Sequence, residues 1–99
     1  MISQKHISYL QEKTRKYFPD KEKVKIFIFG SSLRREKFRD VDMGFLSENN
    51  KEIEKKKFIE LAGEIEESTL PFHVDLVDFH SVEKEFKEYV FKHEKILWI

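Results

Sequence analysis

The sequence predicts an α+β domain, an α/β sandwich in which helices cover a small mixed sheet. Spacings typical of helices alternate with runs typical of strands, in the order helix, strand, strand, helix, strand, helix and a last short strand. The chain has 99 residues, which suits a single domain spanning 1–99. Hydrophobic residues make up 39% and charged residues 38%, which indicates a small core beneath a densely charged surface.

The first helix and the first strand are predicted from periodicity and composition. Residues 2–17 favour a helix, which Pro19 ends. Residues 24–29 form a β-branched and aromatic run, typical of a buried strand, and Gly30 closes it. The helix positions expected to face the core are Ile7, Leu10 and Tyr17.

The middle of the chain predicts two more strands and a second helix. Residues 33–38 are expected to form a short helical turn before a strand over 41–46. Residues 51–68 favour a helix, and residues 72–77 a third strand behind Pro71. The apolar positions of this helix recur at helical spacing and are Phe58, Leu61, Ala62 and Ile65.

The end of the chain predicts a third helix and a short strand. Ser81 is expected to cap a helix over 82–93, and residues 96–99 to form the strand. The apolar stripe of this helix comprises Val82, Phe86, Tyr89 and Val90.

Composition argues against several classes of protein. Nineteen basic and nineteen acidic residues give no net charge, so general nucleic-acid binding is not expected. The absence of cysteine excludes disulfides and thiolate zinc sites and fits a cytoplasmic protein. Residues 1–18 are too polar for a signal peptide, and no apolar run reaches membrane-spanning length, so no membrane contact is expected.

Three aspartates stand at strand positions that a purely structural sequence rarely gives to acids. Asp40 and Asp42 are two residues apart, so both point to one face of an extended segment, while Val41 and Met43 point to the other. Asp75 lies within the third predicted strand. If the two strands are neighbours, the three carboxylates converge on one patch of the sheet.

Clustered carboxylates repel one another unless a cation lies among them. Hard divalent cations such as Mg²⁺ take oxygen ligands and complete their shell with water and substrate phosphates. Two such ions can activate an attacking hydroxyl and stabilise a leaving pyrophosphate. The three aspartates therefore predict a magnesium site with room for two ions.

The corner before the aspartates has features of a phosphate-binding turn. Gly30 lets the backbone turn sharply and approach a ligand, and Ser31 adds a hydroxyl donor. Arg34, Arg35 and Arg39 lie between this corner and the aspartates. Cations thus surround the place expected for a triphosphate.

Together these motifs resemble the minimal nucleotidyltransferases of the polymerase-β superfamily, some of which are antitoxins paired with HEPN-domain ribonuclease toxins. The resemblance spans about residues 24–98 and rests on Phe29-Gly30-Ser31, Asp40-Val41-Asp42 and Val74-Asp75-Leu76. It implies a polymerase-β-like nucleotidyltransferase core. It also implies that Asp40, Asp42 and Asp75 are catalytic and bind Mg²⁺, and that Gly30, Ser31 and Arg34 bind the triphosphate.

The resemblance further implies transfer of AMP from ATP to an acceptor hydroxyl, for example a tyrosine of a HEPN toxin. A tRNA or small-molecule acceptor stays open. Arg35 and Arg39 stand where the family often carries Gly and Ser, which keeps a second hypothesis open: an antitoxin-like binding module that neutralises a toxin by covering it. A third hypothesis is a small sheet-based RNA-binding domain.

Other polar residues receive structural interpretations. Asp78 has the opposite parity to Asp75 and is expected to serve a loop or cap. His73 shares the predicted face of Asp75 and is expected to be a partly exposed strand residue. Phe27 and Phe29 are assigned to the core rather than to base stacking.

Overall fold

The computed structural model describes residues 1–99 and confirms the predicted α+β class and order of elements. The elements are α1 (Gln4–Tyr17), β1 (Val24–Phe29), the 3₁₀ turn η1 (Ser31–Leu33), β2 (Asp40–Ser47), the 3₁₀ turn η2 (Glu48–Asn50), α2 (Lys55–Glu66), β3 (His73–Asp78), α3 (Lys84–His93) and β4 (Ile96–Trp98). No helix combines the length and the hydropathy that a bilayer crossing requires.

One mixed sheet orders the strands β3-β2-β1-β4. β1 pairs antiparallel with both β2 and β4, whereas β2 and β3 run parallel. A parallel pair needs a crossover, and α2 lies in that connection. The two strands that carry the predicted carboxylates are therefore neighbours, as the convergence of these residues requires.

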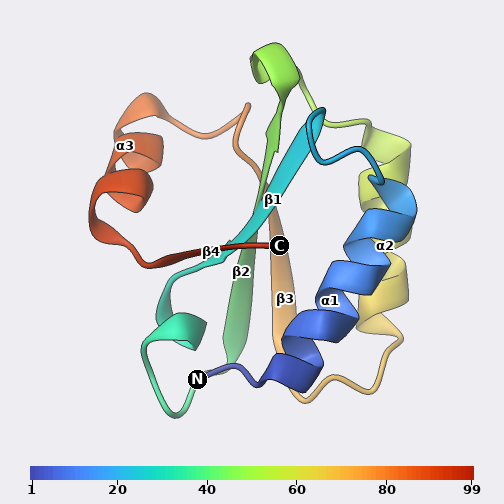
Figure 1. The fold of residues 1–99 in the computed structure, drawn as a ribbon, viewed down its shortest axis with the longest axis vertical. Helices are drawn as coiled ribbons and strands as arrows, with labels where there is room; N and C mark the ends of the chain where they lie inside the picture. Colours follow the sequence, from blue (N-terminus) through green and yellow to red (C-terminus); the bar gives the residue numbers. More distant parts are fainter.

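The helices lie on both faces of the sheet (Figure 1). α1 and α2 cover one face, and α3 lies over the other. Because side chains alternate along a strand, Ile26 and Ile28 join the larger core on the α1–α2 side. Phe27 and Phe29 join a smaller cluster with Phe79 of the β3–α3 loop. Both phenylalanines are thus core residues, as predicted.

The start of α2 differs from the prediction. The helix predicted over 51–68 spans only Lys55–Glu66, and it follows a loop in which Asn49 and Asn50 turn the chain with φ angles of 58° and 53°. Ile53 is then buried before α2 begins, and its backbone N–H donates to Asp78 Oδ2 at 3.1 Å. Asp78 therefore has the structural role expected of it. Of the four apolar positions at helical spacing in this helix, Ala62 is exposed.

Two turns also differ from the predicted positions. The helical turn predicted at 33–38 lies at Ser31–Leu33, because its first hydrogen bond runs from Leu33 N–H to the Gly30 carbonyl (3.1 Å). Ser81 does not cap α3. Its N–H bonds the Asp78 carbonyl at 3.0 Å in a turn after β3, and Glu83 occupies the N-cap position without a side-chain hydrogen bond.

The apolar stripe predicted for α3 is only partly buried. Val90 is 1% exposed, but Phe86 is 42% and Tyr89 is 54% exposed. Both side chains line an open cleft that is also bordered by Asp42 and Phe29, so the sheet covers them only in part. Helical periodicity identifies the stripe but does not show what lies opposite it.

Candidate active site

The chain reverses sharply at the end of β1. Gly30 has φ +88°, a region that L side chains rarely adopt. A Cβ at this position would lie only 3.1 Å from Asp42 Oδ2. The backbone conformation therefore favours glycine, and a side chain at this position would also crowd the Asp42 carboxylate. This corner places Ser31 and Arg34 beside β2.

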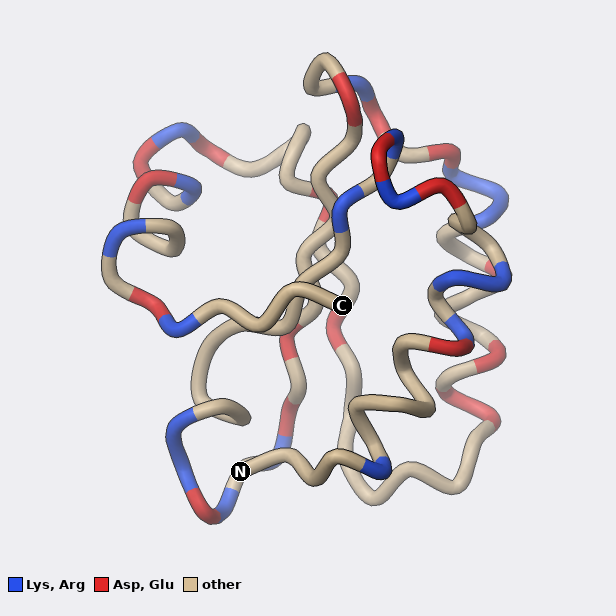
Figure 2. The backbone as a smooth tube through the Cα atoms, viewed as in Figure 1, with Lys and Arg blue, Asp and Glu red and all other residues tan.

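The parallel register of β2 and β3 brings two of the predicted carboxylates together. Asp42 is the partner of Asp75, and Asp40 is the partner of His73. Asp42 is half-buried, whereas Asp40 and Asp75 are exposed. In Figure 2, acidic positions lie on both of these central strands, and basic positions lie on the loop that leads from η1 into β2.

The charges at Asp42 are not balanced by a cation. Burial raises the pKa of the Asp42 carboxyl above its usual value, and repulsion by the Asp75 carboxylate is the next cause. Asp40 and then Glu94 raise this pKa further. A site that holds several carboxylates close to one buried member favours a positively charged ligand.

His73 belongs to the same patch. Its Nε2 lies 2.8 Å from Asp75 Oδ1, and both side chains are about half exposed. It is a partly exposed strand residue, as expected, and it also contacts a carboxylate of the predicted triad. It is the only side chain to which Asp75 is hydrogen-bonded.

A cleft of about 310 Å³ separates α3 from the Gly30 corner. One wall is polar and includes Gly30, Ser31 and Asp42, with Arg34 and Glu94 also on the lining. Phe86 and Tyr89 contribute to the apolar wall. Of the three predicted carboxylates, Asp42 alone lines the cleft.

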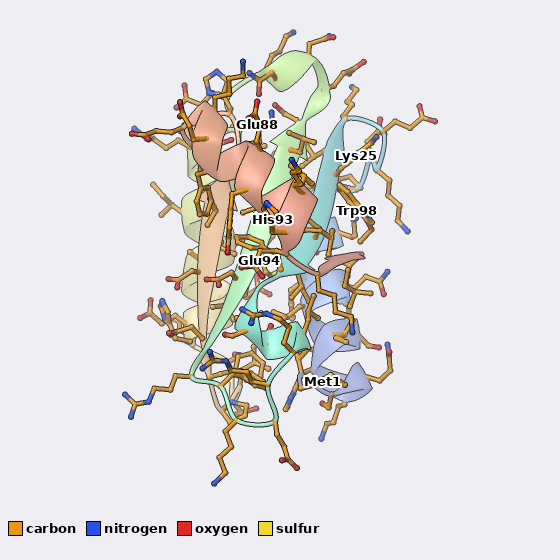
Figure 3. The ribbon with its side chains drawn as sticks, turned by 90° about the vertical axis from the view of Figure 1, so that its left-hand side faces the viewer. Met1, Lys25, Glu88, His93, Glu94 and Trp98 are labelled. Atoms are coloured by element: carbon orange, nitrogen blue, oxygen red, sulfur yellow. The ribbon has the colours of Figure 1, made fainter.

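Glu94 is a cleft residue that sequence patterns do not identify. It follows α3 directly, and its Oε2 lies 3.5 Å from Arg34 Nε. Figure 3 looks onto α3 and shows Glu94 at the lower end of this helix, below His93. Glutamate is common on helix surfaces, so its position beside Asp42 depends on how α3 crosses the sheet.

The donor set is not a closed metal cage. No group of three or more His, Cys, Asp or Glu side chains is arranged to hold a metal ion by itself. Carboxylate oxygens are nevertheless the ligands that Mg²⁺ prefers, and Mg²⁺ is usually held by one or two carboxylates together with substrate phosphates. The arrangement fits a cation that binds together with a phosphate ligand.

Comparison with known proteins supports this chemistry. The family described as "Polymerase beta, Nucleotidyltransferase" matches residues 12–99. A solved toxin–antitoxin complex with AMP-PNP is 28% identical, with a TM-score of 0.62, over 89% of this chain and 72% of that chain. No curated protein sequence matches at a significant level.

Two further structures share the fold. A mutant of the toxin–antitoxin pair MntA–HpeT has a TM-score of 0.68 and 24% identity, over 92% of this chain and 70% of that chain. A protein from Shewanella oneidensis has a TM-score of 0.63 and 24% identity, over 97% of this chain and 72% of that chain. The match of the family over residues 12–99 shows that this chain belongs to the polymerase β nucleotidyltransferases.

Proposed function

We propose that this chain transfers AMP from ATP to an acceptor hydroxyl, and that the acceptor is a tyrosine of a HEPN-type toxin. One observation carries the proposal. The register that pairs Asp42 with Asp75 puts two carboxylates side by side, and the Gly30 corner meets one of them. A phosphate-binding turn beside clustered carboxylates is the arrangement that metal-assisted phosphoryl chemistry needs.

The triphosphate binds at the polar wall of the cleft. Gly30 lets its phosphates approach the backbone, and the Ser31 hydroxyl donates to a phosphate oxygen. Arg34 Nε lies 3.5 Å from Glu94 Oε2, and the guanidinium has further N–H donors that suit phosphate oxygens. The cations of the loop before β2 add a favourable field for a polyanion.

Asp40, Asp42 and Asp75 would hold Mg²⁺ together with the nucleotide. The raised pKa of Asp42 supports this role, because a bound cation offsets the loss of hydration on burial and the repulsion by the neighbouring carboxylates. Bound Mg²⁺ would neutralise charge on the phosphates and lower the pKa of the acceptor hydroxyl. Because the substrate supplies part of the coordination shell, a preassembled set of three ligands is not required.

The reaction is a displacement at the α-phosphorus of ATP. The acceptor oxygen forms a bond to that phosphorus, the bond to the β-phosphate oxygen breaks, and pyrophosphate leaves with the electron pair. Asp75 accepts the proton of the acceptor hydroxyl, since its carboxylate is half exposed at the rim of the site. Asp42 stays ionised beside the metal and orients the triphosphate.

The partner is inferred from the similar structures. Two mutants of MntA–HpeT and the complex with AMP-PNP are toxin–antitoxin assemblies, and the last holds an ATP analogue. A chain of 99 residues has little surface with which to select an acceptor, so a partner chain that presents its own tyrosine completes the site.

Calorimetric titration with ATP, with and without Mg²⁺, tests the proposal. Wild type is expected to bind ATP in the presence of Mg²⁺, and Asp42→Asn is expected to lose this binding. Glu88→Gln is the matched control, since it removes one exposed acid from the middle of α3, away from Glu94 (Figure 3). Equal Mg²⁺-dependent binding by wild type and Asp42→Asn would refute the site.

The same similar structures support a second function, in which the chain neutralises a toxin by covering it. The His73–Asp75 contact favours it, because it occupies a carboxylate that catalysis needs free. Mixing the toxin with Asp42→Asn in the absence of nucleotide separates the two functions. Full neutralisation by the variant would support covering, whereas activity of the toxin would support catalysis.

A further inference from the structure

Two aromatic side chains beside the proposed phosphate site are largely exposed, although they lie on the apolar stripe of α3. Phe86 and Tyr89 are one helical turn apart on α3, so they present their rings on the same side of the helix. Both line the cleft that also contains Gly30, Ser31 and Asp42. Their exposed fractions are 42% and 54%, against 1% for the adjacent Val90.

Phe86 packs against two aromatic rings of the core. Its ring lies 6.4 Å from the Phe29 ring at an interplanar angle of 71°, and 6.1 Å from the Phe79 ring at 43°. Phe29 and Phe79 belong to the small core cluster beneath α3. Part of the Phe86 side chain therefore lies against the core, while 42% of the side chain is exposed beside the cleft.

The Tyr89 ring lies 5.2 Å from the His93 ring, one turn along α3, and 54% of the Tyr89 side chain is exposed. Aromatic area left in water forgoes the stabilisation that burial provides. A cluster of such area next to a polar cleft is typical of a ligand site.

The cleft thus has a polar wall and an aromatic wall. Its polar wall suits phosphate oxygens and its aromatic wall suits a flat, weakly polar ring system. A nucleoside triphosphate contains both parts, with the base and the phosphates at opposite ends. Stacking against an aromatic side chain is available to every base, because each base has a π face.

We propose that Phe86 and Tyr89 form the platform on which the base of the nucleoside triphosphate stacks. The proposal rests on the proposed function, since it assumes that the triphosphate lies at the Gly30 corner. It assigns the base to α3 and makes these two side chains positioning residues that act on binding of the base. The phosphates and the metal do not depend on them.

The test compares ATP with inorganic tripolyphosphate, both with Mg²⁺, by calorimetric titration. Tyr89→Leu and Phe86→Leu keep apolar bulk but remove the aromatic ring. Each is expected to weaken ATP binding about tenfold, and both together about a hundredfold, the size expected for lost base–aromatic stacking. Affinity for tripolyphosphate is expected to stay within twofold of wild type.

Conservative and distant variants complete the experiment. Tyr89→Phe keeps the ring and should bind ATP like wild type. Ile59→Ala changes an exposed apolar side chain (67% exposed) of α2, on the other face of the sheet, and should also leave ATP binding unchanged. Thermal melts of all variants show whether the fold is retained.

Three outcomes would overturn the inference. Unchanged ATP binding by the Tyr89→Leu, Phe86→Leu double variant would show that the base lies elsewhere. Equal weakening of ATP and tripolyphosphate would indicate damage to the cleft as a whole. Failure of wild type to bind either ligand would reject the nucleotide site itself, which distinguishes failure of the proposed function from failure of the platform.

Discussion

Two carboxylates in this molecule, those of Glu64 and Asp42, have opposite surroundings. Glu64 of α2 accepts a hydrogen bond from the Tyr17 hydroxyl at 2.5 Å and lies 3.1 Å from Lys13 Nζ and 3.3 Å from Lys16 Nζ. Asp42 is half-buried beside Asp75 and has no ion pair. The first carboxylate is neutralised by the protein and the second is not.

The pKa values follow this difference. The Tyr17 hydrogen bond is the main cause that lowers the pKa of Glu64 to about 2, and the lysines contribute as well. The same hydrogen bond raises the pKa of Tyr17 to about 12. Burial and then the Asp75 carboxylate raise the pKa of Asp42. The helix pair α1–α2 is therefore stabilised by charges within the chain, whereas the sheet carries an uncompensated charge suited to a ligand.

The largest expected effect is the loss of transfer activity when Asp75 is replaced. Asp75→Asn should lower nucleotidyl transfer about 100-fold or more, because the side chain proposed to accept the proton is lost. ATP binding with Mg²⁺ should fall by less than transfer does, since Asp42 and the cleft are intact. Transfer of labelled AMP to the partner measures the first quantity and calorimetry the second.

Glu64→Gln is the control for this prediction. It removes a carboxylate of equal charge on the opposite face of the sheet and should leave transfer at the wild-type level. Wild-type transfer by Asp75→Asn, or equal losses in the two variants, would contradict a specific role of the sheet carboxylates.

The next effect is on stability, and Glu64 is expected to show it. Its pKa in the folded protein lies below the usual value of 4.5, so its ionisation stabilises the fold. This contribution is complete above pH 4.5 and is lost as the pH falls toward 2. Glu64→Gln should therefore lower the melting temperature by about 4 °C at pH 7 and by much less near pH 2. Thermal melts across this range measure the difference, and a loss that does not depend on pH would contradict it.

The stability contributed by Asp42 should depend on pH in the opposite direction to that of Glu64. The pKa of Asp42 in the folded protein lies above the usual value of 3.8, so its stabilising contribution is present below pH 3.8 and is lost as the pH rises through the raised value. Asp42→Asn should raise the melting temperature at pH 7, without metal or nucleotide, by about 3 °C. The gain should disappear below pH 3.8. A variant less stable than wild type at pH 7 would show that Asp42 is compensated in the free protein.

Sequence patterns predict much of this fold because its strands are strongly marked. The run Val24–Phe29 has the predicted bounds, and alternation along β2 puts Asp40 and Asp42 on the face opposite Val41 and Met43. Spacing alone does not determine that β2 and β3 are parallel neighbours in the register that joins Asp42 to Asp75. That register depends on the α2 crossover and on the core beneath it.

The rest of the candidate site arises from the packing of α3. Phe86 and Tyr89 have the spacing of a core stripe, and only the position of the helix over the cleft leaves them exposed. Glu94 is one acid among many in the sequence, and its contact with Arg34 joins residues sixty positions apart. Such contacts are tertiary, so local patterns carry no signal for them. The roles of all these residues in binding and transfer stay predictions.

The smallest expected effect is on the melting temperature when Glu94, which lies near Asp42, is replaced. Glu94 is the weakest cause of the raised pKa of Asp42, after burial, Asp75 and Asp40. Its replacement should therefore reproduce the Asp42→Asn stabilisation in sign but not in size. Glu94→Gln is expected to raise the melting temperature of the ligand-free protein by about 1 °C at pH 7.

Glu88→Gln is the control. It removes an exposed acid of α3 whose ion pair with Lys84 is long, at 3.9 Å, and should leave the melting temperature unchanged.

The contact of Glu94 with Arg34 opposes the expected gain in stability, because breaking this contact leaves the Arg34 cation unpaired. Double variants separate the two terms. In an Asp42→Asn background, Glu94→Gln no longer relieves repulsion, so only loss of the Arg34 contact remains and stability should fall slightly. Equal effects of Glu94→Gln in both backgrounds would show that Glu94 does not act on Asp42, and that the charge imbalance is confined to the sheet.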